Sequence, residues 1–133
     1  MRTRGWIAIA TGAVLLFGAV TWWALESGEV VVLRTRDARG AVHETRVWIA
    51  SDESGVLWIE AANPERRWYQ DLLVRPEVEV VRGGTPERRH AVPLPGPEEH
   101  AIVRRLLAQR YGLRDCWIGL LADTSRSVGI RLE

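Results

Sequence analysis

The sequence predicts a small, mainly β domain of the α+β class, with two helices, behind one N-terminal transmembrane helix. Three observations predict it: an uncharged apolar run near the N-terminus, successive strand-like segments joined by short polar turns, and two later segments with helix start signals. The roughly one hundred residues after the apolar run suffice for one modest core. We therefore expect an anchor over residues 1–28 and a single domain over residues 29–133.

The length of the apolar run and the residues that end it predict a membrane anchor. No charged residue lies between Gly5 and Leu25, and at about 1.5 Å per residue this run is just long enough to cross a hydrocarbon core of about 30 Å. A cleaved secretory signal is the alternative, but a cleavage site needs small side chains where this sequence has Trp22 and Trp23. Indoles are common at membrane interfaces. We expect residues 6–25 to contact membrane lipid.

The flanking charges predict the orientation of this anchor. Arg2 and Arg4 precede the apolar run, and Glu26 and Glu29 are the first charged residues after it. Positive residues tend to stay on the cytoplasmic side of a membrane. The N-terminus is therefore expected in the cytoplasm, and this arginine bias favours a domain outside it.

Charge and cysteine content exclude several classes of function. All 18 basic residues are arginines, and without Arg2 and Arg4 the remaining 16 balance 17 acidic residues. Such a domain gives no case for nucleic-acid binding. The single cysteine, Cys116, excludes an internal disulfide and a cysteine-rich metal site, and its apolar surroundings predict a packed thiol. We expect no metal site.

The first half of the domain is predicted as an antiparallel meander. A β-branched segment, a clearly alternating segment and a third apolar segment are separated by the polar turns 37–40 and 52–55, which predicts strands over 30–36, 41–51 and 56–61. In the middle strand the alternation places Arg46 and Trp48 on the same face.

Two helices and three further strands are predicted in the second half. Asn63 and Pro64 are a typical helix cap and first helical residue, and Pro76 ends that helix near residue 75. The side chains expected to face the core from this helix are Trp68, Tyr69, Leu72 and Leu73. Strands are expected over 78–82 and 87–92, an amphipathic helix over 97–112, a short helical or irregular piece over 113–121, and a last strand over 127–132.

No established catalytic motif is present. The sequence has no glycine-rich phosphate loop, nucleophile elbow or paired-histidine metal motif. His43, His90 and His100 are scattered and expected at the surface, while Asp115 and Asp123 are too far apart in the chain for an obvious acid/base pair. Catalytic residues therefore stay unassigned.

Arginines and tryptophans give the most informative pattern. Arg46 and Trp48 could offer a guanidinium for an anion beside an indole for a planar ring, although an arginine stem packed along a tryptophan on a solvated face has the same spacing. Arg66 and Arg67 lie on the first turn of the predicted helix, where free backbone N–H groups favour anions. We expect additional positive charge to converge there from Arg34, Arg36 and Arg39.

The order of elements and several phrases resemble the FMN-binding split β-barrel superfamily. The phrases are HETRVWIASDESGVLWIEAANPERRWYQDLLVRPEVEVVRGG and RLLAQRYGLRDCWIGLL. Within it, the sequence looks most like the deazaflavin-dependent nitroreductase and quinone reductase branch. It departs from that branch in the loop 37–40, in having Arg46 where a proline is usual, and in having alanines at 61 and 62 where glycines are common.

The resemblance implies a fold, a cofactor and a site. The fold would be a split β-barrel of about six antiparallel strands with two accessory helices, and the cofactor would be FMN or a deazaflavin. The implied cofactor-binding residues are Arg46, Trp48, Ala61, Ala62, Asn63, Arg66 and Trp68. A site at a subunit interface implies a homodimer, and the implied chemistry is hydride transfer to a lipophilic quinone-like or nitro-type acceptor.

Three hypotheses for function follow. The first is a membrane-anchored flavin- or deazaflavin-dependent oxidoreductase. The alternative is a non-catalytic split-barrel module that binds another ligand or a partner protein, which the altered loop and the predicted location outside the cytoplasm favour. A third is a structural part of a membrane complex. The first conflicts with the arginine bias, because such a reductase expects a cytoplasmic supply of reducing equivalents.

Overall fold

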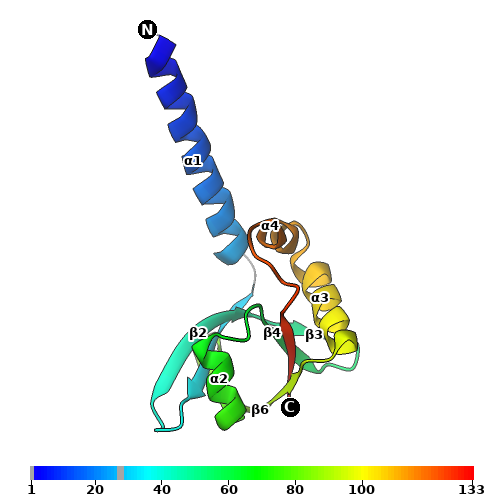
Figure 1. The fold of residues 1–133 in the computed structure, drawn as a ribbon. Coiled ribbons are helices and arrows are strands. Elements are labelled where there is room, and N and C mark those ends of the chain that lie inside the picture. Colours follow the sequence, from blue (N-terminus) through cyan, green and yellow to red (C-terminus); the bar gives the residue numbers. More distant parts are fainter. Residues whose placement is uncertain (1, 27–28) are drawn as a thin grey trace.

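The computed structural model describes residues 2–26 and 29–133 and contains a long helix that stands apart from a curled sheet with three shorter helices (Figure 1). Residues 1, 27 and 28 of the predicted anchor lie outside the described residues. The elements are, in chain order, α1 (Arg2–Glu26), β1 (Val30–Arg36), β2 (Val42–Trp48), β3 (Ala50–Ser51), β4 (Leu57–Ala61), α2 (Arg67–Val74), β5 (Glu77–Arg82), β6 (Thr85–Leu94), α3 (Pro97–Tyr111), α4 (Leu113–Leu121) and β7 (Val128–Leu132).

The described strands form one antiparallel sheet in the order β2-β1-β5-β6-β7-β4-β3. The long strand β6 bends the sheet, because its first part pairs with β5 and its last four residues pair with β7. The two strands at the ends of this order, β2 and β3, are separated in the chain by one residue, Ile49. The sheet therefore curls back on itself, which confirms the predicted split β-barrel.

The predicted strand 41–51 is broken at Ile49, and this break is a correction to the sequence prediction. The backbone N–H of Ile49 donates to the hydroxyl oxygen of Tyr111 (3.1 Å), and this hydroxyl also lies 2.7 Å from the carbonyl oxygen of Glu29 and 3.0 Å from that of Ile49. A tyrosine from α3 thus satisfies the backbone groups that lose their ladder partners where the chain passes from β2 to β3.

The helix predicted to start at Pro64 starts at Arg67. The Asn63 side chain accepts a hydrogen bond from the backbone N–H of Glu65 (2.9 Å), so it closes a turn before the helix instead of capping it. Leu73, expected in the core, is 52% exposed, because this short helix packs only one face, through Tyr69 and Leu72.

The core lies inside the curl of the sheet and under α3. Inside the curl, the most deeply buried side chains include Leu33, Ile59 and Ile130. Helix α3 covers β3, β4 and β7 with the apolar stripe expected from its sequence. A Cβ at Gly129 would lie 3.2 Å from the carbonyl oxygen of Glu99, so a glycine in β7 allows α3 to approach the sheet closely.

Two glycines close the hairpin between β5 and β6. Gly83 and Gly84 have φ of 56° and 82°, which fits a tight two-residue turn and favours glycine at both positions. Pairing begins directly after this turn, at Thr85 opposite Arg82. The strand predicted over 87–92 therefore extends from Thr85 to Leu94.

The expected surroundings of the cysteine and of two histidines are wrong. Cys116 is exposed, because α4 turns other side chains toward the domain. His43 is partly buried, with Nδ1 2.8 Å from Oδ2 of Asp71, since that buried carboxylate needs partners. His100 is also partly buried and lies 3.0 Å from the carbonyl oxygen of Ser127.

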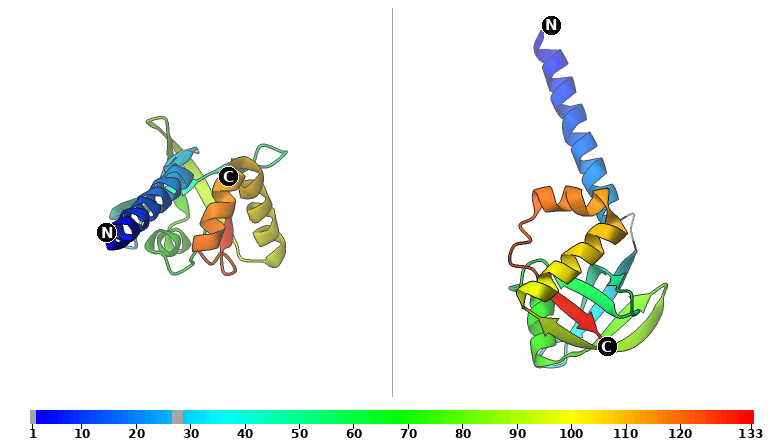
Figure 2. Two further views of the ribbon diagram at one scale, coloured as in Figure 1. Left: turned by 90° about the horizontal axis from the view of Figure 1, so that it is seen from above. Right: turned by 90° about the vertical axis from the view of Figure 1, so that its right-hand side faces the viewer.

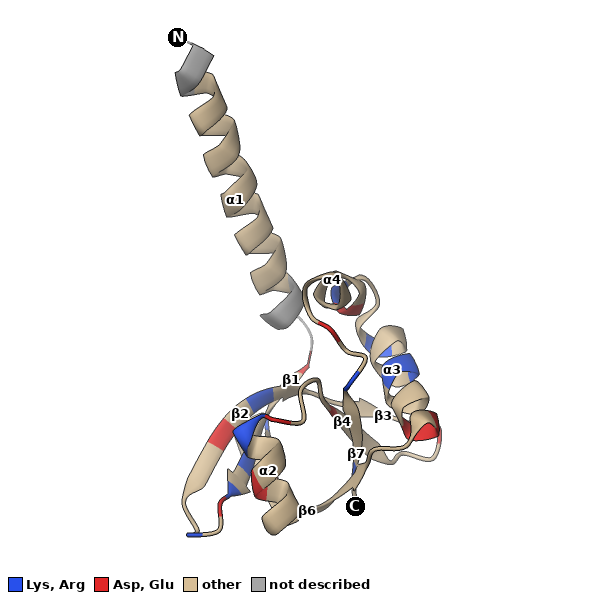
Figure 3. Ribbon diagram, in the orientation of Figure 1, with Lys and Arg blue, Asp and Glu red and all other residues tan. Residues whose placement is uncertain are grey.

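Helix α1 extends away from the domain, which its C-terminal end reaches at α4 (Figures 1 and 2). Residues Gly5–Trp23 have a mean hydropathy of 1.7, and none of this span is buried. Figure 3 shows no charged residue along this part of α1, whereas the domain carries both signs. A helix of this length and composition is suited to a membrane span or a signal sequence.

Candidate functional site

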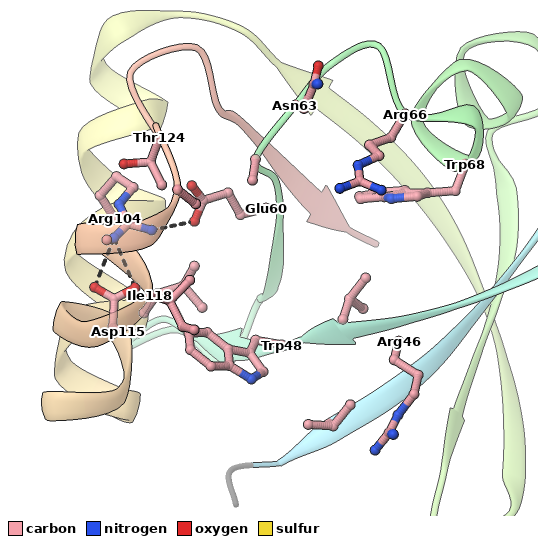
Figure 4. Close-up of a pocket in the computed structure, with 16 residues that line it drawn as sticks. Arg46, Trp48, Glu60, Asn63, Arg66, Trp68, Arg104, Asp115, Ile118 and Thr124 are labelled. Atoms are coloured by element: carbon pink, nitrogen blue, oxygen red, sulfur yellow. Dashed lines mark hydrogen bonds and ion pairs between the residues drawn. The ribbon is translucent and has the colours of Figure 1, made fainter. Parts of the chain in front are cut away.

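A cavity of about 320 Å³ lies between the sheet, the turn before α2, and helices α3 and α4 (Figure 4). Six of the seven residues predicted to bind a cofactor line it: Arg46, Trp48, Ala62, Asn63, Arg66 and Trp68. The seventh, Ala61, is fully buried in the core next to the cavity. Residues far apart in the chain thus meet at one cavity, and their role in binding stays a prediction.

Strand β2 contributes one wall through Arg46 and Trp48. The indole of Trp48 is stacked on the ring of Tyr111, with a centroid distance of 4.3 Å and an interplanar angle of 10°. Tyr111 is itself held by its hydroxyl contacts at Ile49, so the indole is fixed from behind. Burial of Tyr111 raises the pKa of its phenol, which keeps the hydroxyl protonated at neutral pH. Arg46 is exposed at the rim.

The turn before α2 contributes the opposite wall. Ala62, Asn63 and Arg66 are exposed there, and Trp68 is partly buried from the first turn of the helix. In Figure 4 the side chains of Arg66 and Trp68 both come from this side of the cavity. The cavity is therefore bordered by one indole and one arginine from β2 and by one of each from the turn and α2.

The expected convergence of further arginines at this site is wrong. Arg34 pairs instead with Glu44 (2.7 Å) and Glu79 (3.5 Å). Side chains of β1 point alternately into the core and to the outside. Arg36 pairs with Val42 of β2, and Val42 is four residues away from Arg46. Arg36 lines a separate groove of about 390 Å³, whereas Arg39 and Arg67 line neither hollow.

An ion cluster that the sequence prediction missed forms the inner wall. Nη1 of Arg104 lies 2.6 Å from Oε2 of Glu60, and its Nη2 lies 2.9 and 2.8 Å from the two carboxylate oxygens of Asp115. Burial lowers the pKa of Arg104, but the charges and hydrogen bonds of both carboxylates outweigh that and raise it. One permanent cation therefore faces two carboxylates.

Glu60 carries the least satisfied group in this cluster. Its side chain is only 7% exposed, and its Oε1 has no hydrogen-bond partner among the described residues. A buried acceptor without a donor is costly and marks a place where a donor fits. Glu60 is also the only charged residue in β4, and a charge inside an apolar strand is the signal that could have found it.

The charges of the cavity are thus divided. Arg46 and Arg66 lie at the exposed rim, while the carboxylates of Glu60 and Asp115 lie at the buried inner wall around Arg104. Such a cavity suits a ligand with an anionic group at one end and a hydrogen-bond donor at the other, with a planar body between the indoles.

Comparisons with known proteins identify the fold. No family model matches the sequence, and neither does any curated protein. A solved structure of a conserved hypothetical protein from Mycobacterium tuberculosis is 18% identical, with a TM-score of 0.62 over 87% of this chain and 78% of its own. A structure named as an F420-H2 dependent reductase is 21% identical, with a TM-score of 0.58 over 79% of this chain and 94% of its own.

A third similar structure is described as a domain-swapped dimer. It is 20% identical, with a TM-score of 0.59 over 98% of this chain and 99% of its own. At these identities the likeness establishes the fold: this chain has the split β-barrel fold.

Proposed function

We propose that the protein is a membrane-anchored oxidoreductase that uses FMN or a deazaflavin and reduces a lipophilic quinone-like or nitro-type acceptor. The observation that carries this proposal is the meeting of Arg46, Trp48, Ala62, Asn63, Arg66 and Trp68 at one cavity. One similar structure is named as an F420-H2 dependent reductase. Because F420-H2 is a reduced deazaflavin, this name supports a cofactor of the flavin or deazaflavin class.

The residues at the cavity fit such a cofactor. The cavity volume of about 320 Å³ is within the usual range of small-molecule sites, roughly 300–1,000 Å³. Flavins and deazaflavins combine a flat ring, an N–H on its pyrimidine edge and a phosphate-bearing chain. Trp48 and Trp68 suit the ring, and the exposed Arg46 and Arg66 suit the phosphate. Oε1 of Glu60, which has no partner among the described residues, suits the N–H.

Each of these residues then has a defined role in binding. Arg46 and Arg66 bind the anionic chain at the rim, where both side chains are exposed and can form charge-assisted hydrogen bonds with a phosphate. Trp48 holds the ring at a fixed angle because Tyr111 supports it from behind. Glu60 accepts the ring N–H and so fixes which edge of the ring points inward. When bound, the cofactor supplies the hydride, while the protein orients it and excludes water.

We infer three further properties with this function. Residues 1–28 form the anchor and residues 29–133 the catalytic domain, so the domain is held near lipophilic substrates. The chain forms a homodimer, as a domain-swapped dimer of the same fold suggests. The cytoplasm supplies reducing equivalents, so a reductase requires the domain on that side, against the arginine bias. A reporter fused after Glu133 gives the side directly.

Ligand titration tests the cofactor assignment. The full chain is purified in detergent, its absorption spectrum is recorded, and FMN and a deazaflavin are titrated separately. We expect a yellow or fluorescent bound cofactor, or tight binding of one of the two. Colourless protein that binds neither would overturn the proposal, and binding without reduction of a quinone would favour the non-catalytic binding module.

Two variants and a control locate the binding site. Arg46→Ala and Trp48→Ala are each expected to weaken binding by about tenfold, since an ion pair or a ring contact of this kind is worth about 1.4 kcal/mol. Arg36→Ala is the matched control, because Arg36 is an exposed arginine in the separate groove. Equal effects of Arg36→Ala and Arg46→Ala would contradict the assignment.

A further inference from the structure

Helix α4 carries an apolar stripe on its outer side. Leu113, Cys116, Trp117, Leu120 and Leu121 follow the spacing of one helix face. Leu113 and Leu120 are 80% and 77% exposed, and Leu121 and Cys116 are exposed as well. Large leucines in such a row are a costly surface in water, so the row indicates a contact that is not part of the folded domain.

The other side of α4 belongs to the cavity. Asp115 is buried against Arg104, and Ile118 and Gly119 line the cavity from the same helix. Helix α4 therefore has the cavity on one side, where Asp115 and Ile118 lie (Figure 4), and exposed leucines elsewhere on its surface.

Direct contacts between side chains fix the position of α4 along the axis of α1. Nε1 of Trp117 donates to the hydroxyl oxygen of Thr21 (3.0 Å), and the rings of Trp117 and Phe17 lie 5.6 Å apart. The guanidinium of Arg114 lies 5.8 Å from the ring centre of Trp23. Helix α4 thus meets α1 at the last residues of its apolar span.

These contacts place α4 at the level of a lipid surface. The 19 residues Gly5–Trp23 rise about 28 Å, close to the hydrocarbon thickness of about 30 Å, so Trp22 and Trp23 mark one interface. Helix α4 runs across the end of α1 in both Figure 1, where it is seen end-on, and the right-hand view of Figure 2. A helix with that direction lies parallel to a membrane that α1 crosses.

We propose that α4 is an interfacial helix that rests on the lipid bilayer, with Leu113, Leu120 and Leu121 in the boundary between headgroups and acyl chains. Amphipathic helices bind membranes in this way, with the apolar face about 5–10 Å deep. The proposal rests on the anchoring part of the proposed function and is independent of its cofactor. Since α4 also lines the cavity, the ligand site lies one helix away from the lipid, where a lipophilic acceptor is concentrated.

The native cysteine provides the test. Cys116 lies on the stripe and is the single cysteine, so the full chain in phosphatidylcholine/phosphatidylglycerol nanodiscs is labelled there with a small fluorophore. Quenching by brominated acyl chains is compared with quenching by aqueous iodide. The matched control combines Cys116→Ser with Ala38→Cys, which moves the label to the exposed turn between β1 and β2, at the end of the domain away from α1 (Figure 1).

The proposal predicts opposite behaviour of the two labels. The Cys116 label is expected to be quenched several-fold more by brominated lipid than the control label, and several-fold less by iodide. Leu120→Glu, which adds a charge at an exposed position, is expected to move the Cys116 label toward iodide while α1 keeps the chain in the nanodisc.

Three results would overturn the proposal. The first is iodide quenching at Cys116 as strong as at the control position. The second is a Cys116 label shielded from both quenchers and close to the same label on another chain, which would assign the stripe to a second copy. The third is a chain that does not incorporate into nanodiscs, which would remove the anchor as well. None of them bears on cofactor binding, which the titration measures separately.

Discussion

Two hollows of similar size, about 320 and 390 Å³, lie on this domain, and both contain arginines. In the groove, two of the arginines pair with exposed acids, Arg34 with Glu44 and Arg89 with Glu87. In the cavity the charges lie around two indoles and the buried carboxylate of Glu60, one oxygen of which has no partner in the described part of the chain. Arginines therefore do not distinguish the two hollows, whereas the two indoles and the incompletely paired carboxylate among the described residues do.

The largest expected difference between the hollows concerns stability. Arg104→Ala removes the cation between Glu60 and Asp115 and leaves two buried carboxylates uncompensated, so we expect a loss of about 3 kcal/mol in the free energy of unfolding. Arg34→Ala, in the exposed groove, is expected to change it little. Denaturant unfolding of both variants gives the comparison, and equal losses would show that burial does not distinguish the two sites.

The next effect concerns the anion at the rim. Arg66→Ala is expected to weaken FMN or deazaflavin binding by about tenfold through loss of a charge-assisted contact to phosphate. The same substitution at Arg88, which lines the groove, should leave binding unchanged. Isothermal titration at two salt concentrations checks this, because the difference between the variants should shrink at high salt. A salt-independent loss would assign Arg66 a packing role instead.

A smaller effect is expected at the inner wall. Glu60→Gln keeps the shape and one acceptor oxygen but loses the charge, so binding of a ring N–H should weaken by about 1 kcal/mol, roughly fivefold. The change should appear equally for riboflavin, which lacks the phosphate. Tighter binding of FMN with no change for riboflavin would place the phosphate, and not the ring, beside Glu60, because the substitution removes a negative charge that repels phosphate.

The smallest effect lies outside both hollows. Asp52 accepts hydrogen bonds from Ser54 and from Nε1 of Trp58, which lower its pKa to about 2. Its contribution to stability is therefore complete above the unfolded-state pKa near 4 and is lost as pH falls toward about 2. Asp52→Asn should flatten the pH dependence of stability in that window, as measured by thermal unfolding, without changing ligand binding. An unchanged pH profile would contradict the role given to these hydrogen bonds.

Local patterns were sufficient to predict most of the fold. β-Branched residues predicted β1, turn residues predicted the hairpin around Gly83 and Gly84, and the 3.6-residue period predicted α3, because these elements are set by neighbouring residues. The break at Ile49 could not be predicted this way, since it depends on Tyr111, 62 residues later. The start of α2 was missed because Asn63 can close a turn as well as cap a helix.

The candidate site was predictable on one side only. Strand alternation singled out Arg46 and Trp48, and the resemblance added Trp68, which lies in a short family-like phrase. The cluster of Glu60, Arg104 and Asp115 joins a strand and two helices and has no local signature. Whether these residues bind a cofactor stays a prediction for the titrations above.

The pairing of β4 with β7 has a consequence for how the chain is made. Leu57 pairs with Leu132, 75 positions later, so β4 leaves the ribosome long before its partner on that edge exists. During that interval β1, β2, β5 and β6 can already pair, whereas β4 has only the two-residue strand β3 beside it. If α1 is already inserted, the incomplete sheet lies at the membrane surface while the edge of β4 that will pair with β7 is still exposed. We expect this last pairing to limit the rate of folding, because distant strand pairs close slowly.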